Sequence, residues 1–243
     1  MQQTEIGRAE FVSLGGDLRG YYACPVGMGP SPGVVLFQEA FGINGYIESE
    51  VRRLASHGFA AIAPDLFRGE TFGYGEWEKV QPKLQSLTDE GMLDDVRASI
   101  AFLDGQSEVK RGAVGCVGFC MGGRLAYLSA TTLGEKIAAA ASFYGGGIAP
   151  DQPRFFKPIL DKADGLRGEL LLIYGADDEG ITPSEHGRIA SRLSELKKRY
   201  TLSVYPGAPH GFASRDRESY RARQAEAAWA ETLALFERAL RVG

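Results

Sequence analysis

The sequence predicts an α/β fold with a mostly parallel central sheet, helices on both faces of that sheet and an antiparallel hairpin at the N-terminus. The first observation behind this prediction is that short apolar runs alternate with amphipathic segments from residue 33 onward. Continuous apolar runs are typical of strands buried on both faces, as in parallel sheets. The second observation is a pair of β-like runs within 9–25. A chain of 243 residues can bury the core of such a domain, which we predict to span 1–243.

The predicted strands and helices alternate along the chain. The N-terminal hairpin turns at Gly15-Gly16-Asp17, because glycine supplies the positive φ that a tight turn needs. The apolar run 33–38 predicts a strand, and apolar residues at helical spacing predict a helix over 44–57. The pattern continues with strands at 58–66, 112–119, 137–145, 169–175 and 200–207, and with helices at about 121–133, 184–198 and 216–241.

Three stretches have a less regular pattern. Residues 76–104 are charged and partly amphipathic, and the overlapping stretch 68–90 is expected to contribute lid elements to a pocket. Residues 146–168 contain three prolines and several charges, which predicts a long surface excursion.

The composition disfavours several classes of partner. A net charge of −4 provides no basic surface for a phosphate backbone, so we expect a small-molecule partner and no nucleic acid. No apolar run is long enough to span a bilayer, and the N-terminus lacks a signal-peptide pattern, which predicts a cytoplasmic protein without membrane contact. Cys24, Cys116 and Cys120 fit neither a disulfide framework nor zinc spacing. No metal or cofactor is implied, and we expect a monomer or a weak dimer.

Reactive side chains gather where the predicted strands end. Parallel strands bring their carboxyl ends to one edge of the sheet, which is where ligands bind in open α/β folds. A thiol, several carboxylates, a guanidinium and an imidazole therefore become neighbours in the prediction. These residues are Glu39, Asp65, Arg68, Cys120, Asp177, Asp178 and His210.

The segment Gly118-Phe119-Cys120-Met121-Gly122 matches the nucleophile elbow G-x-S-x-G with sulfur in place of oxygen. A sharp turn from strand to helix strains the backbone at the nucleophile and leaves no room for side chains two residues away. The helix N-terminus and a nearby imidazole would both favour the reactive thiolate. By contrast, Cys116 lies within a predicted strand and is expected to be a core residue, and Cys24 is expected to be inert.

A histidine and an acid follow Cys120 in the chain order of this elbow type. His210 lies in a loop after the last predicted strand, whereas His57 and His186 are expected at solvated positions. Asp177 and Asp178 both follow the strand 169–175, and spacing alone does not separate them as partners of the imidazole. Glu179 is a weaker third choice.

Glu39 is a surplus carboxylate at the same predicted edge. It is either a turn residue bonded to local amides or a second partner for the thiol. In the second case it would take the thiol proton, or hold it until substrate arrives.

Blocks along most of the chain resemble the dienelactone hydrolase family of the α/β-hydrolase fold. They are LFQEAFGINGYI, VRRLASHGFAAIAPDLFRGE, GAVGCVGFCMGGRLAY, FYGGG, LLIYGADDEGITP and YPGAPHGF, followed by the C-terminal amphipathic segment. The resemblance implies that Cys120 is the nucleophile, His210 the base and Asp178 the triad acid. It also implies that Glu39 contacts the resting thiol, and that the N–H groups of Met121 and Ala40 form the oxyanion hole.

The family's dienelactone enzymes bind the substrate carboxylate with two arginines. The nearest matches are Arg68, displaced by one residue, and Arg215, because Ser214 occupies the position four residues past His210. The resemblance as a whole implies a cofactor-free hydrolase of carboxymethylenebutenolide in aromatic-compound degradation. The displaced arginines leave hydrolysis of another activated ester or thioester open. A non-catalytic binding or redox-sensing thiol protein is a third possibility, in which Cys120 would be oxidised reversibly.

Overall fold

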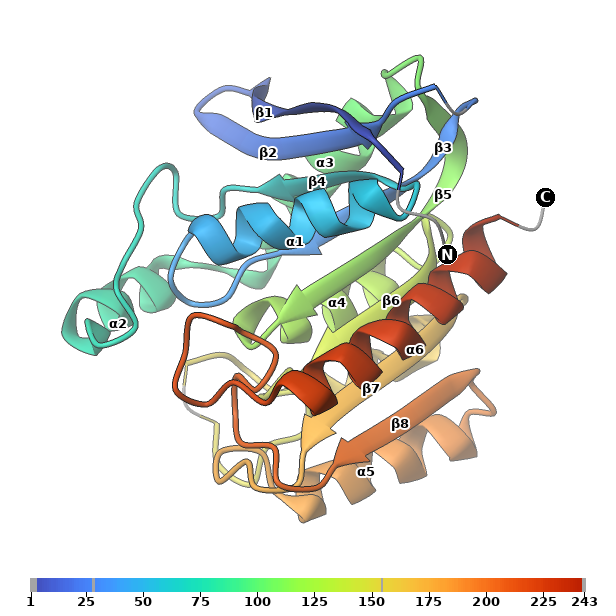
Figure 1. Cartoon of the computed structure of the whole chain (residues 1–243). Helices are drawn as coiled ribbons and strands as arrows, with labels where there is room; N and C mark the ends of the chain where they lie inside the picture. The colour runs from blue at the N-terminus through green and yellow to red at the C-terminus, as the bar shows by residue number, and fades with distance from the viewer. Residues whose placement is uncertain (1–3, 28, 154, 242–243) are drawn as a thin grey trace. The chain divides into compact units, whose positions relative to one another are not determined.

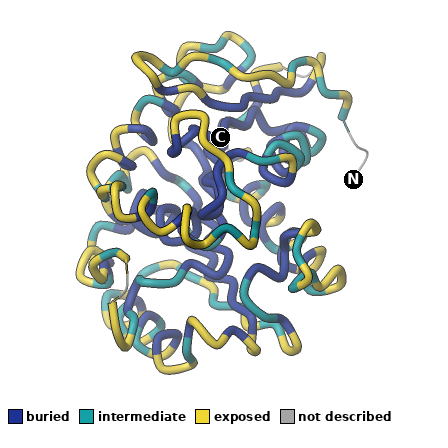
Figure 2. Tube along the Cα trace, turned by 90° about the vertical axis from the view of Figure 1, so that its left-hand side faces the viewer, coloured by how far each residue is buried: buried dark blue, intermediate teal, exposed yellow. Residues whose placement is uncertain are grey.

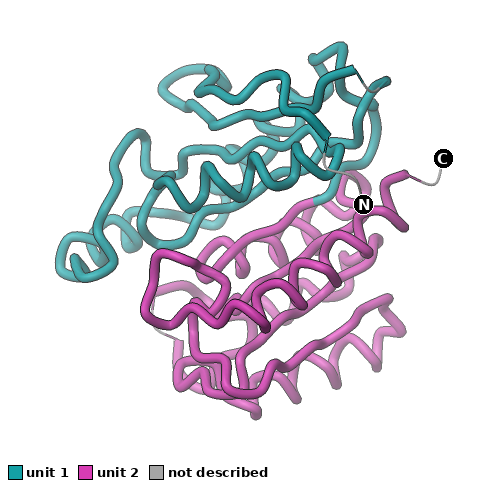
Figure 3. The backbone as a smooth tube through the Cα atoms, in the orientation of Figure 1, with its two compact units in different colours: residues 1–115 teal, residues 116–243 magenta. Residues whose placement is uncertain are grey.

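The computed structural model describes residues 4–27, 29–153 and 155–241. Their contacts divide the chain into two compact units, residues 1–115 and residues 116–243 (Figure 3). The inner strands β2 to β7 are largely buried, whereas the residues of β1 and β8 are intermediate or exposed (Figure 2). The single domain over 1–243 stays a prediction.

In the described part of the chain, eight strands form one mostly parallel sheet in the order β1-β2-β4-β3-β5-β6-β7-β8 (Figure 1). The pairs β1–β2 and β2–β4 are antiparallel, and β3–β4, β6–β7 and β7–β8 are parallel. Strand β5, Val109–Phe119, passes from the first unit into the second. The predicted fold class is therefore confirmed.

The first unit begins with the predicted hairpin, and Gly15 and Gly16 have φ angles of 109° and 57° in its turn. Asn44 caps the first helix by accepting the N–H of Ile47 at 3.1 Å, and Gly58 follows its end with a φ of 83°. The less regular stretch 76–104 contains two helices. The elements are β1 Ile6–Gly15, β2 Leu18–Pro25, β3 Ser31–Phe37, α1 Gly45–Ser56, β4 Ala60–Pro64, α2 Trp77–Ser86 and α3 Asp89–Asp104.

The second unit places helix α4 deep in the fold, with every residue except Thr132 buried. Helix α6 begins at Ala222 and not at 216. Successive turns occupy residues 211–221, and the N–H of Arg221 donates to the carbonyl of Phe212 at 2.9 Å. The elements are α4 Met121–Thr132, β6 Ile137–Phe143, the 3₁₀ helix η1 Leu160–Gly165, β7 Glu169–Gly175, α5 Pro183–Glu195, β8 Tyr200–Tyr205 and α6 Ala222–Leu240.

The prediction of a surface excursion at 146–168 is partly wrong. The segment includes η1 and buries the apolar side chains of Ile148, Ile159 and Leu166. These residues lie 11 and 7 positions apart among prolines and charges, so no continuous helical or strand pattern indicated their burial in the sequence.

Candidate active site

Cys120 lies at the turn between β5 and α4, in the conformation that a nucleophile elbow requires. Its φ of 56° and ψ of −115° are a strained combination for a residue with a side chain. The turn is tight enough that a Cβ on Gly118 would lie 2.0 Å from the carbonyl oxygen of Gly122. The N–H of Cys120 donates to the carbonyl of Phe143 at 3.0 Å, which fixes the turn against β6. The strained backbone thus presents a half-buried thiol at the N-terminus of a buried helix.

Asp178 and His210 form the closest acid–imidazole pair of the described residues. The Nδ1 atom of His210 lies 2.7 Å from Oδ2 of Asp178. The other carboxylate oxygen of Asp178 accepts the N–H groups of Gly180 at 2.9 Å and Ile181 at 3.2 Å. The Asp178 side chain is fully buried, so its position is fixed from two sides. Asp177, which the sequence left as an alternative, is exposed on the same turn.

The imidazole of His210 interacts with both Cys120 and Asp178. Burial lowers the pKa of His210, but the charge of Cys120 and the hydrogen bonds to Asp178 and Cys120 more than offset this effect. The pKa of His210 is raised to about 10 as a result. The imidazole of His210 therefore interacts electrostatically with the thiol of Cys120 and with the carboxylate of Asp178.

We expect the imidazole of His210 to stay protonated at neutral pH, and histidine NMR titration measures this directly. Because the folded imidazole binds its proton more tightly than an ordinary one of pKa 6.5, its contribution to the free energy of unfolding is complete below pH 6.5. That contribution is lost as the pH rises toward 10. In Cys120→Ala the pKa should fall, since the negative partner is gone. A pKa that is the same in both proteins would contradict the contact.

Tyr144 is a site residue that the sequence analysis missed. It directly follows β6, has a positive φ of 38° and is fully buried. Its ring packs edge-on against the imidazole of His210, with centroids 5.1 Å apart, and against Phe212 at 5.6 Å. Tyr144 therefore supports one side of the His210 ring. The only signal in the sequence was its place in the block FYGGG, just past a strand.

The predicted oxyanion-hole and glutamate residues lie directly after the ends of their strands. Glu39 and Ala40 follow β3 in the first unit, and both are almost fully buried. Gln38 beside them accepts the N–H of Leu66 through its side-chain oxygen at 3.3 Å. Met121 is the first residue of α4 in the second unit. The roles of Glu39, Ala40 and Met121 stay predictions.

The two arginines that were expected to bind substrate have different surroundings. Both terminal nitrogens of Arg68 lie 2.8 Å from the carboxylate of Asp95, and its Nε lies 3.2 Å from Asp17. Arg68 therefore ties the hairpin turn to α3 within the first unit. Arg215 is exposed in the loop before α6.

His186 is not solvated, contrary to the expectation from sequence. Its ring stacks on Tyr174 at a centroid distance of 4.2 Å and is buried between α5 and β7. Burial lowers the pKa of His186, although the charge of Asp178 opposes this effect. This burial was not predicted, because the sequence alone does not show that α5 turns His186 toward β7, the strand that precedes it.

Cys116 is buried, as predicted, and Cys24 is buried too. Burial raises the pKa of the Cys116 thiol, and Cys24 also has a raised pKa because of its burial. Among the described residues, no three His, Cys, Asp or Glu side chains are grouped so as to hold a metal ion. In the same part of the chain, no helix has the length and apolar character needed to cross a membrane.

Comparison with known proteins identifies the relatives of this chain. The model of the dienelactone hydrolase family matches residues 18–240. A Synechocystis protein that carries the name carboxymethylenebutenolidase is 34% identical over 230 residues, which cover 92% of this chain and 93% of that protein. A Bradyrhizobium protein named as a 2-oxo-3-(5-oxofuran-2-ylidene)propanoate lactonase is 32% identical over 237 residues, or 95% of this chain and 94% of that protein.

Solved structures agree with the sequence comparisons. A crystal structure from Klebsiella pneumoniae that carries the name dienelactone hydrolase superposes with a TM-score of 0.86 at 28% identity, covering 96% of this chain and 99% of that one. The fold, the matched family model and the near end-to-end relatives therefore lead to one conclusion. This chain is a hydrolase that acts on esters, and it belongs to the dienelactone hydrolase family.

Proposed function

We propose that this protein hydrolyses an activated lactone or enol ester of the carboxymethylenebutenolide class, as in aromatic-compound degradation, with Cys120 as the nucleophile. The observation that carries the proposal is the 2.7 Å contact of Asp178 with His210, whose imidazole also interacts with Cys120 at the elbow. A thiol, an imidazole and a buried carboxylate in this order are the parts of a nucleophilic triad.

In the first half of the proposed reaction, the Cys120 thiolate attacks the carbonyl carbon of the lactone. The electron pair of the carbonyl bond moves to oxygen, and the N–H groups of Met121 and Ala40 stabilise the resulting oxyanion. When the intermediate collapses, the ring C–O bond breaks and protonated His210 gives its proton to the leaving oxygen. The product of this half is a thioester on Cys120.

In the second half, His210 removes a proton from water as the water attacks the thioester. The C–S bond then breaks, the thiolate is restored and the acid product leaves. Asp178 stabilises the imidazolium in both halves and holds its Nδ1–H in place.

A cysteine nucleophile favours substrates whose alcohol leaves easily. The tetrahedral intermediate can expel either the thiolate or the alcohol oxygen, and a thiolate leaves more readily than an ordinary alkoxide. An enol oxygen competes successfully, because its negative charge is delocalised. Simple alkyl esters and amides should therefore return to starting material instead of forming the thioester.

One observation favours a second candidate, an activated ester or thioester without a carboxylate. The guanidinium of Arg68 is held by Asp95 and Asp17, so binding a substrate carboxylate would require it to exchange partners. The lactonase name of the Bradyrhizobium relative, by contrast, supports the first candidate, whose substrate is a lactone.

Substrate profiling distinguishes these candidates. We expect the carboxylated dienelactone to be hydrolysed with a kcat/KM at least about 100-fold above that of a saturated lactone or a simple ethyl ester, because only the first has a good leaving group. The loss of its ultraviolet absorbance measures the rate. Rapid turnover of aryl esters or thioesters without turnover of the dienelactone would replace the first candidate with the second. Equal rates on activated and simple esters would contradict both.

A further inference from the structure

The outer edge of β8 has the features of a self-association surface. Among the described strands β8 is the last in the sheet order, so β7 pairs with one of its sides only. Such an edge presents main-chain N–H and C=O groups that can pair with another strand. We propose that β8 pairs antiparallel with β8 of a second copy of this chain, with Leu202 opposite Leu202 of the second copy.

Main-chain hydrogen bonds show which residues of β8 face outward. The carbonyl of Arg199 accepts from Leu170 at 3.0 Å, and the carbonyl of Tyr205 accepts from Ala176 at 2.8 Å. Because residues alternate along a parallel ladder, the odd-numbered residues from 199 to 205 direct their main-chain groups toward β7. The N–H and C=O groups of Tyr200, Leu202 and Val204 therefore point to the free edge.

These three residues determine the register of the proposed pair. With Leu202 opposite itself, Tyr200 lies opposite Val204 of the second copy and the reverse. Each of the three hydrogen-bonded pairs then contributes two main-chain hydrogen bonds. If the second strand shifts by two residues in one direction, Tyr200 comes opposite Pro206, which has no N–H to donate. The opposite shift brings in Lys198, whose N–H already donates to Leu193 at 2.9 Å.

Side chains on both faces suit this register. On the face toward α5, Val204 has 43% of its surface exposed, and Tyr200 of the second copy would cover it as an aromatic and β-branched cross-strand pair. On the face toward α6, Arg199 comes opposite Tyr205 of the second copy. The hydroxyl of Tyr205 donates to Glu231 at 2.5 Å, so each Arg199 approaches a carboxylate of the other copy.

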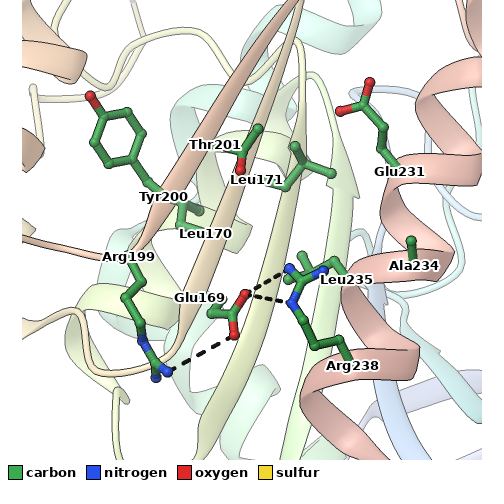
Figure 4. Close-up of a pocket in the computed structure, with 10 residues that line it drawn as sticks. All are labelled: Glu169, Leu170, Leu171, Arg199, Tyr200, Thr201, Glu231, Ala234, Leu235 and Arg238. Carbon is green, nitrogen blue, oxygen red and sulfur yellow. Dashed lines mark hydrogen bonds and ion pairs between the residues drawn. The ribbon is translucent and has the colours of Figure 1, made fainter.

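The groove in Figure 4 provides room for this charge pairing. It has a volume of about 450 Å³ and lies between β7, β8 and α6, with Leu170, Leu171 and Leu235 among its lining residues. Arg199 lies at its rim with 69% of its side chain exposed, and its contact to Glu169 is a long 3.9 Å. The guanidinium of Arg199 can therefore turn toward Glu231 of the second copy by giving up a hydrogen bond to the carbonyl of Arg167 at 3.2 Å, without breaking a close ion pair.

The other edge strand, β1, is built differently. It carries an ion pair between Arg8 and Glu10, and its register shifts at Ile6/Arg8 and Ser13/Gly15. Charges and bulges are the devices that protect an edge from pairing. Strand β8, with the sequence YTLSVY, has no charge and no proline, and its register with β7 is continuous from Tyr200 to Tyr205. This contrast singles out β8 as the pairing edge.

Amide hydrogen exchange tests the proposed register residue by residue. In the dimer the amides of Tyr200, Leu202 and Val204 become protected as the protein concentration rises from about 10 µM to about 1 mM, while those of Thr201 and Ser203 are protected throughout. Sedimentation should show the mass rising toward that of two chains over the same range. A monomer at all these concentrations with unchanged exchange would overturn the proposal. So would a dimer in which the three amides stay unprotected.

Two variants test the contacts. Leu202→Pro removes an outward N–H without removing a bond to β7, and it should be monomeric with unchanged circular dichroism. Arg199→Glu should weaken dimerisation about 10-fold or more, and adding Glu231→Arg should restore it. Ester hydrolysis should be unchanged in all of them, since none of these residues belongs to the proposed triad or oxyanion hole. If Arg199→Glu and the double variant dimerise like the wild type, the proposed register is wrong, even if Leu202→Pro fails to fold.

Discussion

We expect Cys120→Ala to lower kcat/KM for an activated lactone by at least about 10⁴-fold, because no thioester can form without the thiol. The strained turn keeps its shape through Gly118 and the bond from residue 120 N–H to Phe143, neither of which involves the sulfur. The loss should therefore appear as lost turnover in a protein that still folds, with its thermal stability lowered only by the loss of the contact between Cys120 and protonated His210. Initial-rate kinetics and a thermal unfolding curve measure the two effects.

Cys116→Ala provides the matched control. Cys116 lies on the preceding strand, is fully buried, has a raised pKa and donates to the carbonyl of Ala126 at 3.7 Å, so it should contribute to stability and not to catalysis. We expect its kcat/KM to stay within about 3-fold of the wild type, with a loss of unfolding free energy of about 1 kcal/mol. If Cys116→Ala removes activity and Cys120→Ala does not, the wrong cysteine has been identified.

Asp178→Asn should lower kcat by about 10³- to 10⁴-fold with little change in KM. The amide keeps an oxygen to accept the N–H groups of Gly180 and Ile181, so the turn after β7 persists. Its NH₂ group, however, faces Nδ1 of His210, where the carboxylate oxygen now lies 2.7 Å away. The imidazole then loses the charge that stabilises its protonated form.

Asp177→Asn is the neighbouring control, since it makes the same chemical change on an exposed side chain of the same turn. We expect its kcat to stay within about 2-fold of the wild type. Steady-state kinetics on both variants separates the two residues. A loss that is equal in the two variants, or larger in Asp177→Asn, would show that the acid was chosen wrongly.

The periodicity of the sequence was sufficient to predict most of the fold. Buried strands such as 169–175 are continuous apolar runs with turn residues at their ends, so neighbouring residues in the chain are enough to predict them. The position of Cys120 at the turn between a strand and a helix could also be predicted, because the elbow needs glycine two residues before and after it. Both features depend on neighbours in the chain, which a single sequence records.

Other features depend on contacts between distant segments. Spacing could not show whether Asp177 or Asp178 is the partner of His210. The two side chains point in different directions from one turn, and His210 lies in a loop that is far away in the chain. The resemblance to the family had implied Asp178, and the structure brings that residue against His210. The support that Tyr144 gives to His210 could not be predicted for the same reason. The stacking of His186 on Tyr174 joins consecutive elements, but it depends on which side of α5 faces β7. The start of α6 was misjudged because the turns before it are as polar as a helix surface.

The nucleophile can be identified by mass spectrometry of protein quenched in acid during turnover of a slowly deacylated activated ester. The proposed mechanism predicts a mass increase equal to the acyl group, on the peptide that contains Cys116 and Cys120, with fragment ions that assign it to Cys120. The increase should be absent in Cys120→Ala. An acyl group on another residue, or rapid turnover by Cys120→Ala, would contradict the mechanism.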